Sequence, residues 1–185
     1  MGNNRFYIGD THFGHANILG FKRDDGTPLR QFTSVYEMDG YMVSKWNEVV
    51  KDTDTVYHLG DICIHSKNLD ILRGLKGRKI LIMGNHDRDK VTKYIQYFAD
   101  VRAYDRKDGI ICSHIPIHPG SLGKFGVNVH GHLHYQEVKM KSQYSSEMVI
   151  DPRYFNVSVE CIDYTPVEYS VLMGRIEQRQ KQYER

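Results

Sequence analysis

The chain has 185 residues, 40% of them hydrophobic and 26% charged, a composition typical of a globular protein that can bury its own core. Lysine and arginine total 25 against 23 aspartate and glutamate, so the formal net charge is +2. A net charge this small would not attract nucleic acid to the protein as a whole, but it does not exclude a local basic groove. No apolar run approaches the roughly 20 residues of a membrane span and the N-terminus lacks the apolar stretch of a signal peptide, so we expect a cytoplasmic protein without a membrane partner.

Hydrophobic periodicity predicts strands that alternate with helices, and without repeats or linkers we expect one α/β domain over residues 1–185. Ser34 opens the first predicted helix and Thr165-Pro166 opens the last, each with a glutamate three residues after the capping position. In chain order the predicted elements are a strand at 4–9, a helix at 35–50, a strand at 55–59, a short helix at 69–75, a strand at 79–83, a helix at 90–98, strands at 101–104, 109–112, 127–130 and 154–159, and the final helix.

Several of these strands lead directly into short clusters of Gly, Asp, Asn and His. In layered α/β folds, ligands bind where the carboxyl ends of strands and their loops converge, so we expect the clusters to meet at one edge. Residues i and i+2 of an extended segment point to the same side, which lets each D-x-H or H-x-H pair present two ligands to one pocket. The clusters are Asp10-Thr11-His12, Gly60-Asp61, Gly84-Asn85-His86-Asp87, Ser113-His114 and Gly131-His132-Leu133-His134.

The clusters together offer carboxylates, one carboxamide and five imidazoles. Such an oxygen and nitrogen set without thiolate suits manganese, iron, nickel, cobalt or zinc. It is too rich in imidazole for calcium, and magnesium normally prefers an all-oxygen shell. A single cluster of this kind is more often an ordinary turn or a hydrogen-bonded core histidine. All five in this order, each at a strand end, predict a metal site.

The order D-x-H, G-D, G-N-H-D, H and G-H-x-H resembles the calcineurin-like metallophosphoesterase family, over positions 10 to 134. The stretch D-T-H-F-G-H-A-N-I-L, with Phe32 and Trp46-Asn47, is similar to a compact subgroup common in bacteria and their phages. The resemblance implies a four-layer α/β/β/α sandwich of two mixed sheets flanked by helices, with the metals at one edge.

The resemblance also implies a role for nine residues. It places Asp10, His12 and His134 on a first metal, Asn85, His114 and His132 on a second metal, Asp61 as the bridge between the two, His86 as the catalytic histidine and Asp87 as the carboxylate that orients it.

Two divalent ions with two carboxylates and a bridging hydroxide would keep a charge of about +1, which suits an anionic phosphate. We expect hydrolysis of a phosphodiester, with a phosphomonoester as the alternative, by in-line attack of the metal-bridging hydroxide, with His86 assisting the leaving group. Manganese is the expected metal, and iron, nickel, cobalt and zinc are alternatives. The expected substrate is a phosphorylated small molecule or a nucleotide, with the diester favoured by analogy to small bacterial phosphodiesterases.

Other polar residues near the clusters have less specific signals. His15 and Asn17 follow the first cluster in the same loop, and either could contact phosphate or brace the ligands. Arg23 and Arg30 belong to an insert at 20–34 that could form a basic rim or lid over the metals, or only a solvated surface loop. His58 and His130 are expected in the wall or core, and His65 and His118 on solvated loops.

Three other functions compete with the phosphoesterase. A nuclease acting on DNA or RNA ends is the enzymatic alternative, although nothing in the charge balance indicates nucleic acid. A non-catalytic interaction scaffold with this fold would be expected to lose His86 or some ligands, and all of them are present. A structural metal or nucleic-acid-binding module would hold one chelator-resistant ion and hydrolyse no phosphoester. The number of subunits stays open.

Overall fold

The computed structural model describes residues 3–183 of the chain. Its larger sheet has the strand order β11-β1-β2-β3-β4, in which β1 to β4 run parallel and β11 is antiparallel to β1. The strands are β1 (Arg5–Ile8), β2 (Thr55–His58), β3 (Arg78–Ile82), β4 (Asp100–Arg102) and β11 (Val167–Glu168).

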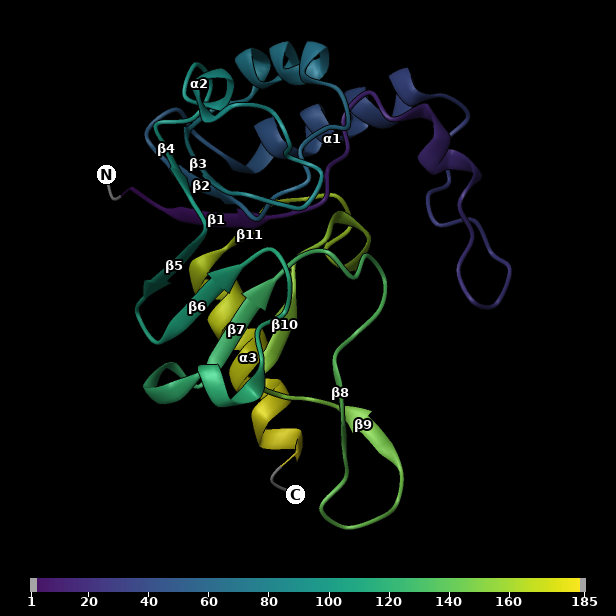
Figure 1. Ribbon diagram of the computed structural model, residues 1–185, viewed down its shortest axis with the longest axis vertical. Coiled ribbons are helices and arrows are strands. Elements are labelled where there is room, and N and C mark those ends of the chain that lie inside the picture. Colours follow the sequence, from purple (N-terminus) through teal and green to yellow (C-terminus); the bar gives the residue numbers. More distant parts are fainter. Residues whose placement is uncertain (1–2, 184–185) are drawn as a thin grey trace.

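A second sheet has the order β10-β7-β6-β5, with β5 antiparallel to an otherwise parallel set. A separate hairpin, β8 with β9, extends away from the body of the molecule (Figure 1). These strands are β5 (Tyr104–Lys107), β6 (Ile110–Ser113), β7 (Val127–His130), β8 (Lys139–Lys141), β9 (Met148–Ile150) and β10 (Tyr154–Asn156). The expected α/β class with two mixed sheets is therefore confirmed.

The α-helices are α1 (Val35–Val49), α2 (Val91–Tyr94) and α3 (Tyr169–Tyr183), and short 3₁₀ segments are η1 (Ala16–Gly20), η2 (Ser66–Gly74), η3 (Pro119–Ser121), η4 (Gly123–Phe125) and η5 (Val159–Cys161). Helix α1 begins where the sequence indicates, because the Ser34 hydroxyl accepts the Glu37 N–H at 3.2 Å. The Glu37 carboxylate reaches back to the Thr33 N–H at 2.7 Å. No helix in residues 3–183 is long and apolar enough to cross a membrane.

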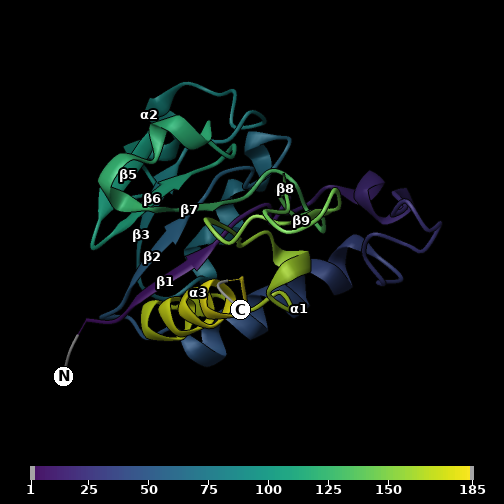
Figure 2. The same cartoon turned by 90° about the horizontal axis from the view of Figure 1, so that it is seen from below.

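One hydrophobic core joins both sheets and the long helices. Helix α1 packs on the larger sheet through Trp46, whose ring stacks on that of His58 in β2 with centroids 6.5 Å apart. Helix α3 runs beside the smaller sheet, where Arg179 lies 4.9 Å from the centre of the Phe155 ring in β10 (Figures 1 and 2). Strands β2, β6 and β7 are buried along their whole length, so only their ends and the following loops reach a surface.

Five expected elements differ from the structure. The final helix does not open at Thr165-Pro166, because Val167 and Glu168 pair with β1 as an edge strand and α3 begins at Tyr169. The helix expected at 90–98 is reduced to one turn, and the one expected at 69–75 is the 3₁₀ segment η2. The strand expected at 101–104 is divided between β4, which ends at Arg102 in the larger sheet, and β5, which begins at Tyr104 in the smaller sheet, and the strand expected at 154–159 ends at Asn156. At Val167 the pairing with β1 outweighs the local capping signal.

Candidate metal centre

The predicted clusters all lie beyond the carboxyl ends of parallel strands. Asp10, Asp61 and Asn85 follow β1, β2 and β3 of the larger sheet, and His114 and His132 follow β6 and β7 of the smaller one. Backbone hydrogen bonds join neighbouring loops. The Asp10 N–H donates to the Gly60 carbonyl at 3.0 Å, and the Gly131 N–H donates to the His114 carbonyl at 3.0 Å. The expected convergence therefore holds for ligands from both sheets.

The backbone at this edge is held in an uncommon conformation. Among residues 3–183, eight non-glycine residues have positive φ, and five of them are predicted ligands. Left-handed backbone is unfavourable for residues with a side chain, and such outliers gather at functional sites, where surrounding contacts hold them. The five have φ between 49° and 71° and are Asp10, His12, Asp61, His132 and His134.

Two motif glycines are required for close packing around the carboxylates. A Cβ atom at Gly84 would collide with the carboxylate of Asp61, and a Cβ atom at Gly131 would collide with the carboxylate of Asp10. Neither glycine has positive φ, so the constraint at these two positions is space rather than backbone conformation. The glycines of G-N-H-D and G-H-x-H thus let two loops lie directly on the acidic ligands.

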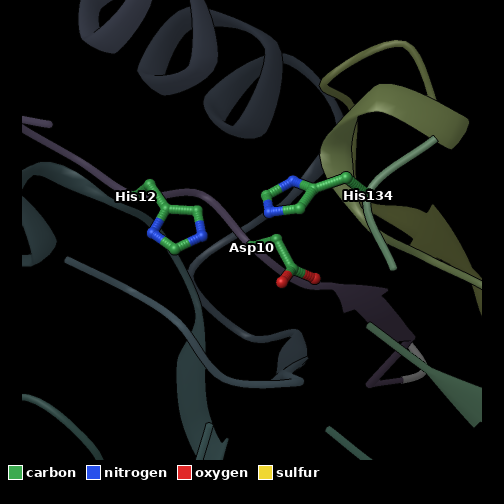
Figure 3. Close-up of side chains that lie close together, drawn as sticks. All are labelled: Asp10, His12 and His134. Carbon is green, nitrogen blue, oxygen red and sulfur yellow. The ribbon is translucent and has the colours of Figure 1, made fainter. Parts of the chain in front are cut away.

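Asp10, His12 and His134 form one group of potential metal ligands. Figure 3 shows the two imidazoles on either side of the carboxylate. One donor atom from each of the three lies within 4.8 Å of the others. A hydrogen bond of 3.0 Å joins the Nδ1 atom of His134 to Glu160 Oε1, so the Nε2 atom of His134 is the one left to bind a metal.

Asp10, Asp61 and His114 form a second group with the same mutual spacing. The Nδ1 atom of His114 is bonded to the Leu59 carbonyl at 2.7 Å, which directs its Nε2 atom toward the site. That Nε2 atom lies 2.8 Å from Asn85 Oδ1 and 3.5 Å from Asp61 Oδ2. The ring of His132 lies edge-on to the ring of His114, with centroids 5.1 Å apart.

Asp10 is the residue common to both groups, and Asp61 belongs to the second. The carboxylate of Asp61 also lies beside histidines of both expected metal sets. Its Oδ2 atom lies 3.7 Å from His12 Nε2, 3.5 Å from His114 Nε2 and 4.0 Å from His86 Nε2. Its Oδ1 atom accepts the backbone N–H of His86 at 2.8 Å. One carboxylate therefore faces a histidine from each expected metal set and the expected catalytic histidine.

Burial and neighbouring charges set the protonation states of these groups. Burial alone would raise the pKa of Asp61, but its hydrogen bond with His114 and the nearby imidazoles lower it to about 2. Burial raises the pKa of Asp10 to about 6. Burial, together with the charge of Arg30, lowers the pKa of His12 well below its usual value. Neutral imidazole and ionised carboxylate are the forms that bind metal ions.

The residues present fit a divalent cation. Both ring nitrogens of His12 are buried without a hydrogen-bond partner among the described residues. A buried polar atom left unpaired is costly, and a coordinated ion would satisfy one of these nitrogens. The surrounding donors are imidazole nitrogens and carboxylate or amide oxygens, the set preferred by borderline metal ions. The structure thus contains Asp/His groups that could hold a metal.

His86 borders this site, and Asp87 does not contact its ring. The side chain of His86 is 40% exposed, which leaves it accessible to a substrate. The carboxylate of Asp87 is buried and accepts three backbone N–H groups, from Asp61 at 2.9 Å, Ile62 at 3.1 Å and Gly84 at 2.8 Å. The expectation that Asp87 holds the His86 imidazole is therefore corrected. Asp87 joins two ligand loops because their N–H groups converge on its oxygens.

The three expected substrate-binding residues lie at different distances from the centre. The ring of His15 is 5.8 Å from that of His12, and its Nδ1 atom is buried without a partner in the described chain. Asn17 is exposed on η1. Arg23 lies over the ring of Tyr135 at 5.3 Å, which ties the 20–34 insert to the residue after His134. Only His15 is thus in contact distance of a ligand histidine.

Arg30 and Glu160 form a buried ion pair behind the first ligand group. Arg30 is 2% exposed and donates to the carbonyls of Asp10 at 2.6 Å and Thr11 at 2.8 Å. It also donates to Glu160 Oε1 at 2.7 Å, the same atom that is bonded to His134. The possible role of Arg30 in a surface rim is therefore corrected: it holds the first ligand loop from inside.

Glu160 is a residue of the site that no motif in the sequence predicts. Its one local signal is that it follows the strand predicted at 154–159, as the other site residues follow theirs. Burial would raise the pKa of Glu160, but Arg30 and the hydrogen bond with His134 lower it to about 2. Ser158, two residues earlier, also donates its hydroxyl to Asp10 Oδ2 at 2.9 Å. The segment 158–160 thus supports both acidic and imidazole ligands.

One known protein is similar to this chain over nearly its whole length, and a phage protein is similar over less than half of it. The uncharacterized protein MJ1445 of Methanocaldococcus jannaschii is 35% identical over 179 residues, which are 93% of this chain and 90% of that protein. The gene 66 protein of Mycobacterium phage L5 is 34% identical over 91 residues, 45% of this chain and 40% of that protein.

A solved structure shares the fold. It is the protein of unknown function AQ665 from Aquifex aeolicus, with a TM-score of 0.67 and 26% identity over 94% of this chain and 100% of that one. No family model matches the chain. The names of these relatives state no activity, and a shared fold does not by itself indicate a function.

Proposed function

The chain belongs to the same family as MJ1445, and we propose from its candidate metal centre that it is a dinuclear metal-dependent phosphoesterase of the calcineurin-like type, with phosphodiesters as preferred substrates. The observation that carries this proposal is the position of Asp61. Its Oδ2 atom lies within 4.0 Å of the Nε2 atoms of His12, His114 and His86, so one carboxylate can serve both ligand sets beside an accessible histidine.

The chain's own residues would hold two ions, with the assignment that the sequence resemblance implies. Asp10, His12 and His134 would bind one ion, Asn85, His114 and His132 the other, and Asp61 both. When bound, such ions supply positive charge to phosphate oxygens and lower the pKa of a coordinated water. Manganese is the proposed metal because the imidazole and carboxylate set suits it, although iron, nickel, cobalt and zinc fit the same donors.

His86 would act on the leaving group. Its backbone N–H is fixed by Asp61 Oδ1, while its ring is partly exposed at the border of the site. An imidazole in this position can hold a proton at Nε2 and deliver it to a departing oxygen. Asp87 would contribute indirectly, because its three backbone hydrogen bonds fix the loops that carry Asp61 and His86.

We also propose that the sheets and long helices stack as the four-layer α/β/β/α sandwich. The contact of Trp46 in α1 with β2 supports a helix layer on the larger sheet. Helix α3 contacts β10 of the smaller sheet through Arg179 and β1 of the larger sheet through Tyr169, so it covers the place where the two sheets meet. In this arrangement both sheets end at the same edge, where their loops combine into one site. The ligands from β1 to β3 and from β6 and β7 are consistent with it.

The test is a hydrolysis panel with Mn²⁺-loaded protein. The panel compares bis-p-nitrophenyl phosphate, p-nitrophenyl phosphate, cyclic nucleotides and short DNA, with a chelated sample as blank. We expect the model diester to be hydrolysed faster than the monoester and the chelated sample to be inactive. Absence of hydrolysis of every ester by metal-loaded protein would refute the phosphoesterase. Faster turnover of DNA ends than of the small diester would favour a nuclease.

His86→Ala is the sharper variant for the same assay. We expect turnover of the model diester to fall by about 10²- to 10⁴-fold, the usual contribution of a general acid or base, with the metal content unchanged. The exposed His118→Ala is the matched control and should keep wild-type turnover. Metal content is measured by elemental analysis of the purified proteins. A wild-type rate in His86→Ala would remove His86 from the mechanism.

A further inference from the structure

A cavity of about 560 Å³ opens beside the second ligand group. Asn85, His114 and Gly84 form the wall that it shares with the candidate metal centre. Its volume is in the range of pockets that enclose a small organic ligand. A phosphate held at the ligand group would therefore have its organic substituent beside this cavity.

The rest of the cavity is mainly apolar. Its lining includes Met83, Ala103, Ile111, Ile115 and Ile117. The side chain of Ile115 is 51% exposed, although it follows His114 directly. Exposed apolar surface around a concave site is typical of a ligand pocket, because a ligand can remove that surface from water.

An aromatic residue and a cation border the same cavity. Tyr104 is 52% exposed, and the guanidinium of Arg106 lies 5.5 Å from the centre of its ring and 5.8 Å from that of Phe125. An exposed tyrosine ring can stack on a planar group, and base–aromatic stacking contributes about 1–3 kcal/mol per base. Ser113, also in the lining, is already engaged, because its hydroxyl donates to the Ile115 carbonyl and accepts from Asn128.

We propose that this cavity is the specificity site of the enzyme and binds a planar, nucleobase-sized group attached to the substrate's phosphate. The inference rests on the proposed function for the position of the phosphate. A short alcohol or a sugar alone would leave the isoleucine wall in water, whereas a planar heterocycle can cover it and stack on Tyr104. Its polar edges can meet Arg106 and Ser121 at the border of the cavity.

The test measures binding to the Mn²⁺-loaded protein by calorimetry, with three phosphates that differ only in their organic group. Adenosine 5′-monophosphate should bind at least tenfold more tightly than methyl phosphate and more tightly than hexyl phosphate. Tyr104→Ala and Ile115→Asp should each weaken binding of the nucleotide at least fivefold. Ile95→Asp is the matched control, since Ile95 is 56% exposed and lies outside the cavity lining.

Equal affinity for the nucleotide and methyl phosphate would overturn the proposal, as would tighter binding of hexyl phosphate. An equal loss of affinity in Ile95→Asp would also overturn it. Adenosine added to chelated protein separates the cavity from the metal centre, with the amide resonances of Ala103 and Ile111 as the readout. Shifts at these resonances without any ester hydrolysis would refute the phosphoesterase and leave the cavity site standing. Hydrolysis without such shifts, and with equal phosphate affinities, would refute the cavity site alone.

Discussion

Single residues at this site are positioned by contacts that reach across the chain. Glu160 illustrates this, because one of its oxygen atoms meets both Arg30, 130 positions away, and the imidazole of His134. A carboxylate on the far nitrogen of a ligand histidine fixes the orientation of the ring and raises its basicity. The guanidinium in turn keeps that carboxylate ionised and holds the carbonyls of Asp10 and Thr11. The geometry of the candidate ligands thus depends on residues outside the two ligand groups.

Glu160→Gln tests this support. The variant keeps the shape of the side chain but leaves the Arg30 guanidinium buried without its anionic partner. We expect the metal-free protein to lose about 3 kcal/mol of unfolding free energy, measured by urea denaturation, and the affinity for Mn²⁺ to fall about 10- to 100-fold. Glu177→Gln in α3 is the control, because its side chain lies on the surface. Unchanged Mn²⁺ affinity would show that Glu160 has a structural role alone.

The buried His58 leads to a prediction of how the unfolding free energy depends on pH. It is fully buried, its Nε2 atom is bonded to the Thr11 hydroxyl at 3.0 Å, and burial lowers its pKa to about 3. Between that value and the unfolded pKa of about 6.5, the unfolded chain binds a proton that the folded chain does not. The folded state therefore keeps the full contribution of neutral His58 above pH 6.5 and loses it progressively as the pH falls toward 3.

The matching measurement compares the wild type with His58→Gln, which cannot titrate but can still bond to Thr11. From pH 7 to pH 5, the wild-type protein should lose about 2 kcal/mol more unfolding free energy than the variant. The unfolding free energies of the two proteins at the two pH values are measured by urea denaturation of chelated samples. Parallel losses in the two proteins would mean that His58 is charged in the fold or that its pKa is unshifted.

Among helices and strands, a local sequence signal predicts a segment correctly when the tertiary contacts of that segment favour the same structure. Helix α1 has a serine cap and an apolar stripe that ends up buried as Met38, Met42 and Trp46. Strand β3 contains the continuous apolar run 80–82 and lies between β2 and β4 in the parallel part of the sheet, as such runs usually do. The capping signal at Thr165 does not begin a helix, because Val167 pairs with Tyr7 as part of an edge strand. A strand of two residues carries no periodicity from which it could be predicted.

Loop packing at the strand ends gives a prediction at this scale. Gly131→Ala should push the Asp10 carboxylate off the loop after β7, because the new Cβ has no space beside it. We expect Mn²⁺ affinity to fall at least tenfold, since small displacements of a ligand strongly weaken a metal site. Gly40→Ala in α1 meets open space and should instead stabilise the protein by about 0.5–1 kcal/mol. The Mn²⁺ affinities of the two variants are measured by calorimetric titration, and equal affinities in Gly131→Ala and Gly40→Ala would contradict the steric argument.

At the scale of the whole molecule, the candidate metal centre joins the two sheets. Its potential ligands follow β1, β2 and β3 on one side and β6 and β7 on the other, and backbone hydrogen bonds link the loops of each sheet. The two carboxylates, Asp10 and Asp61, lie together between them within one ligand group. Cations bound there would neutralise that charge and connect both halves of the core. We therefore expect metal binding to raise the unfolding free energy of the whole domain.

Mn²⁺ should raise the thermal midpoint of the chelated protein. A hundredfold excess over the dissociation constant adds about 2.7 kcal/mol, which corresponds to roughly 5–10 °C for a chain of this length. The shift should be lost in Asp61→Asn, whose amide removes the central negative charge. Differential scanning fluorimetry across a Mn²⁺ series measures both proteins. An equal shift in wild type and Asp61→Asn would place the ion elsewhere.

Which donor atoms gather, and at which edge, can be predicted from the amino-acid sequence. The acids, amide and imidazoles stand directly after strands, and parallel strands bring their carboxyl ends to one edge, so proximity follows from order along the chain. The partners of those side chains depend on the tertiary structure. The bonds of Asp87 to the N–H groups of Asp61 and Ile62, the pairing of Arg30 with Glu160 and the cavity beside Asn85 all join segments distant in sequence. Such contacts arise when these segments pack together, and no local pattern of residues encodes them.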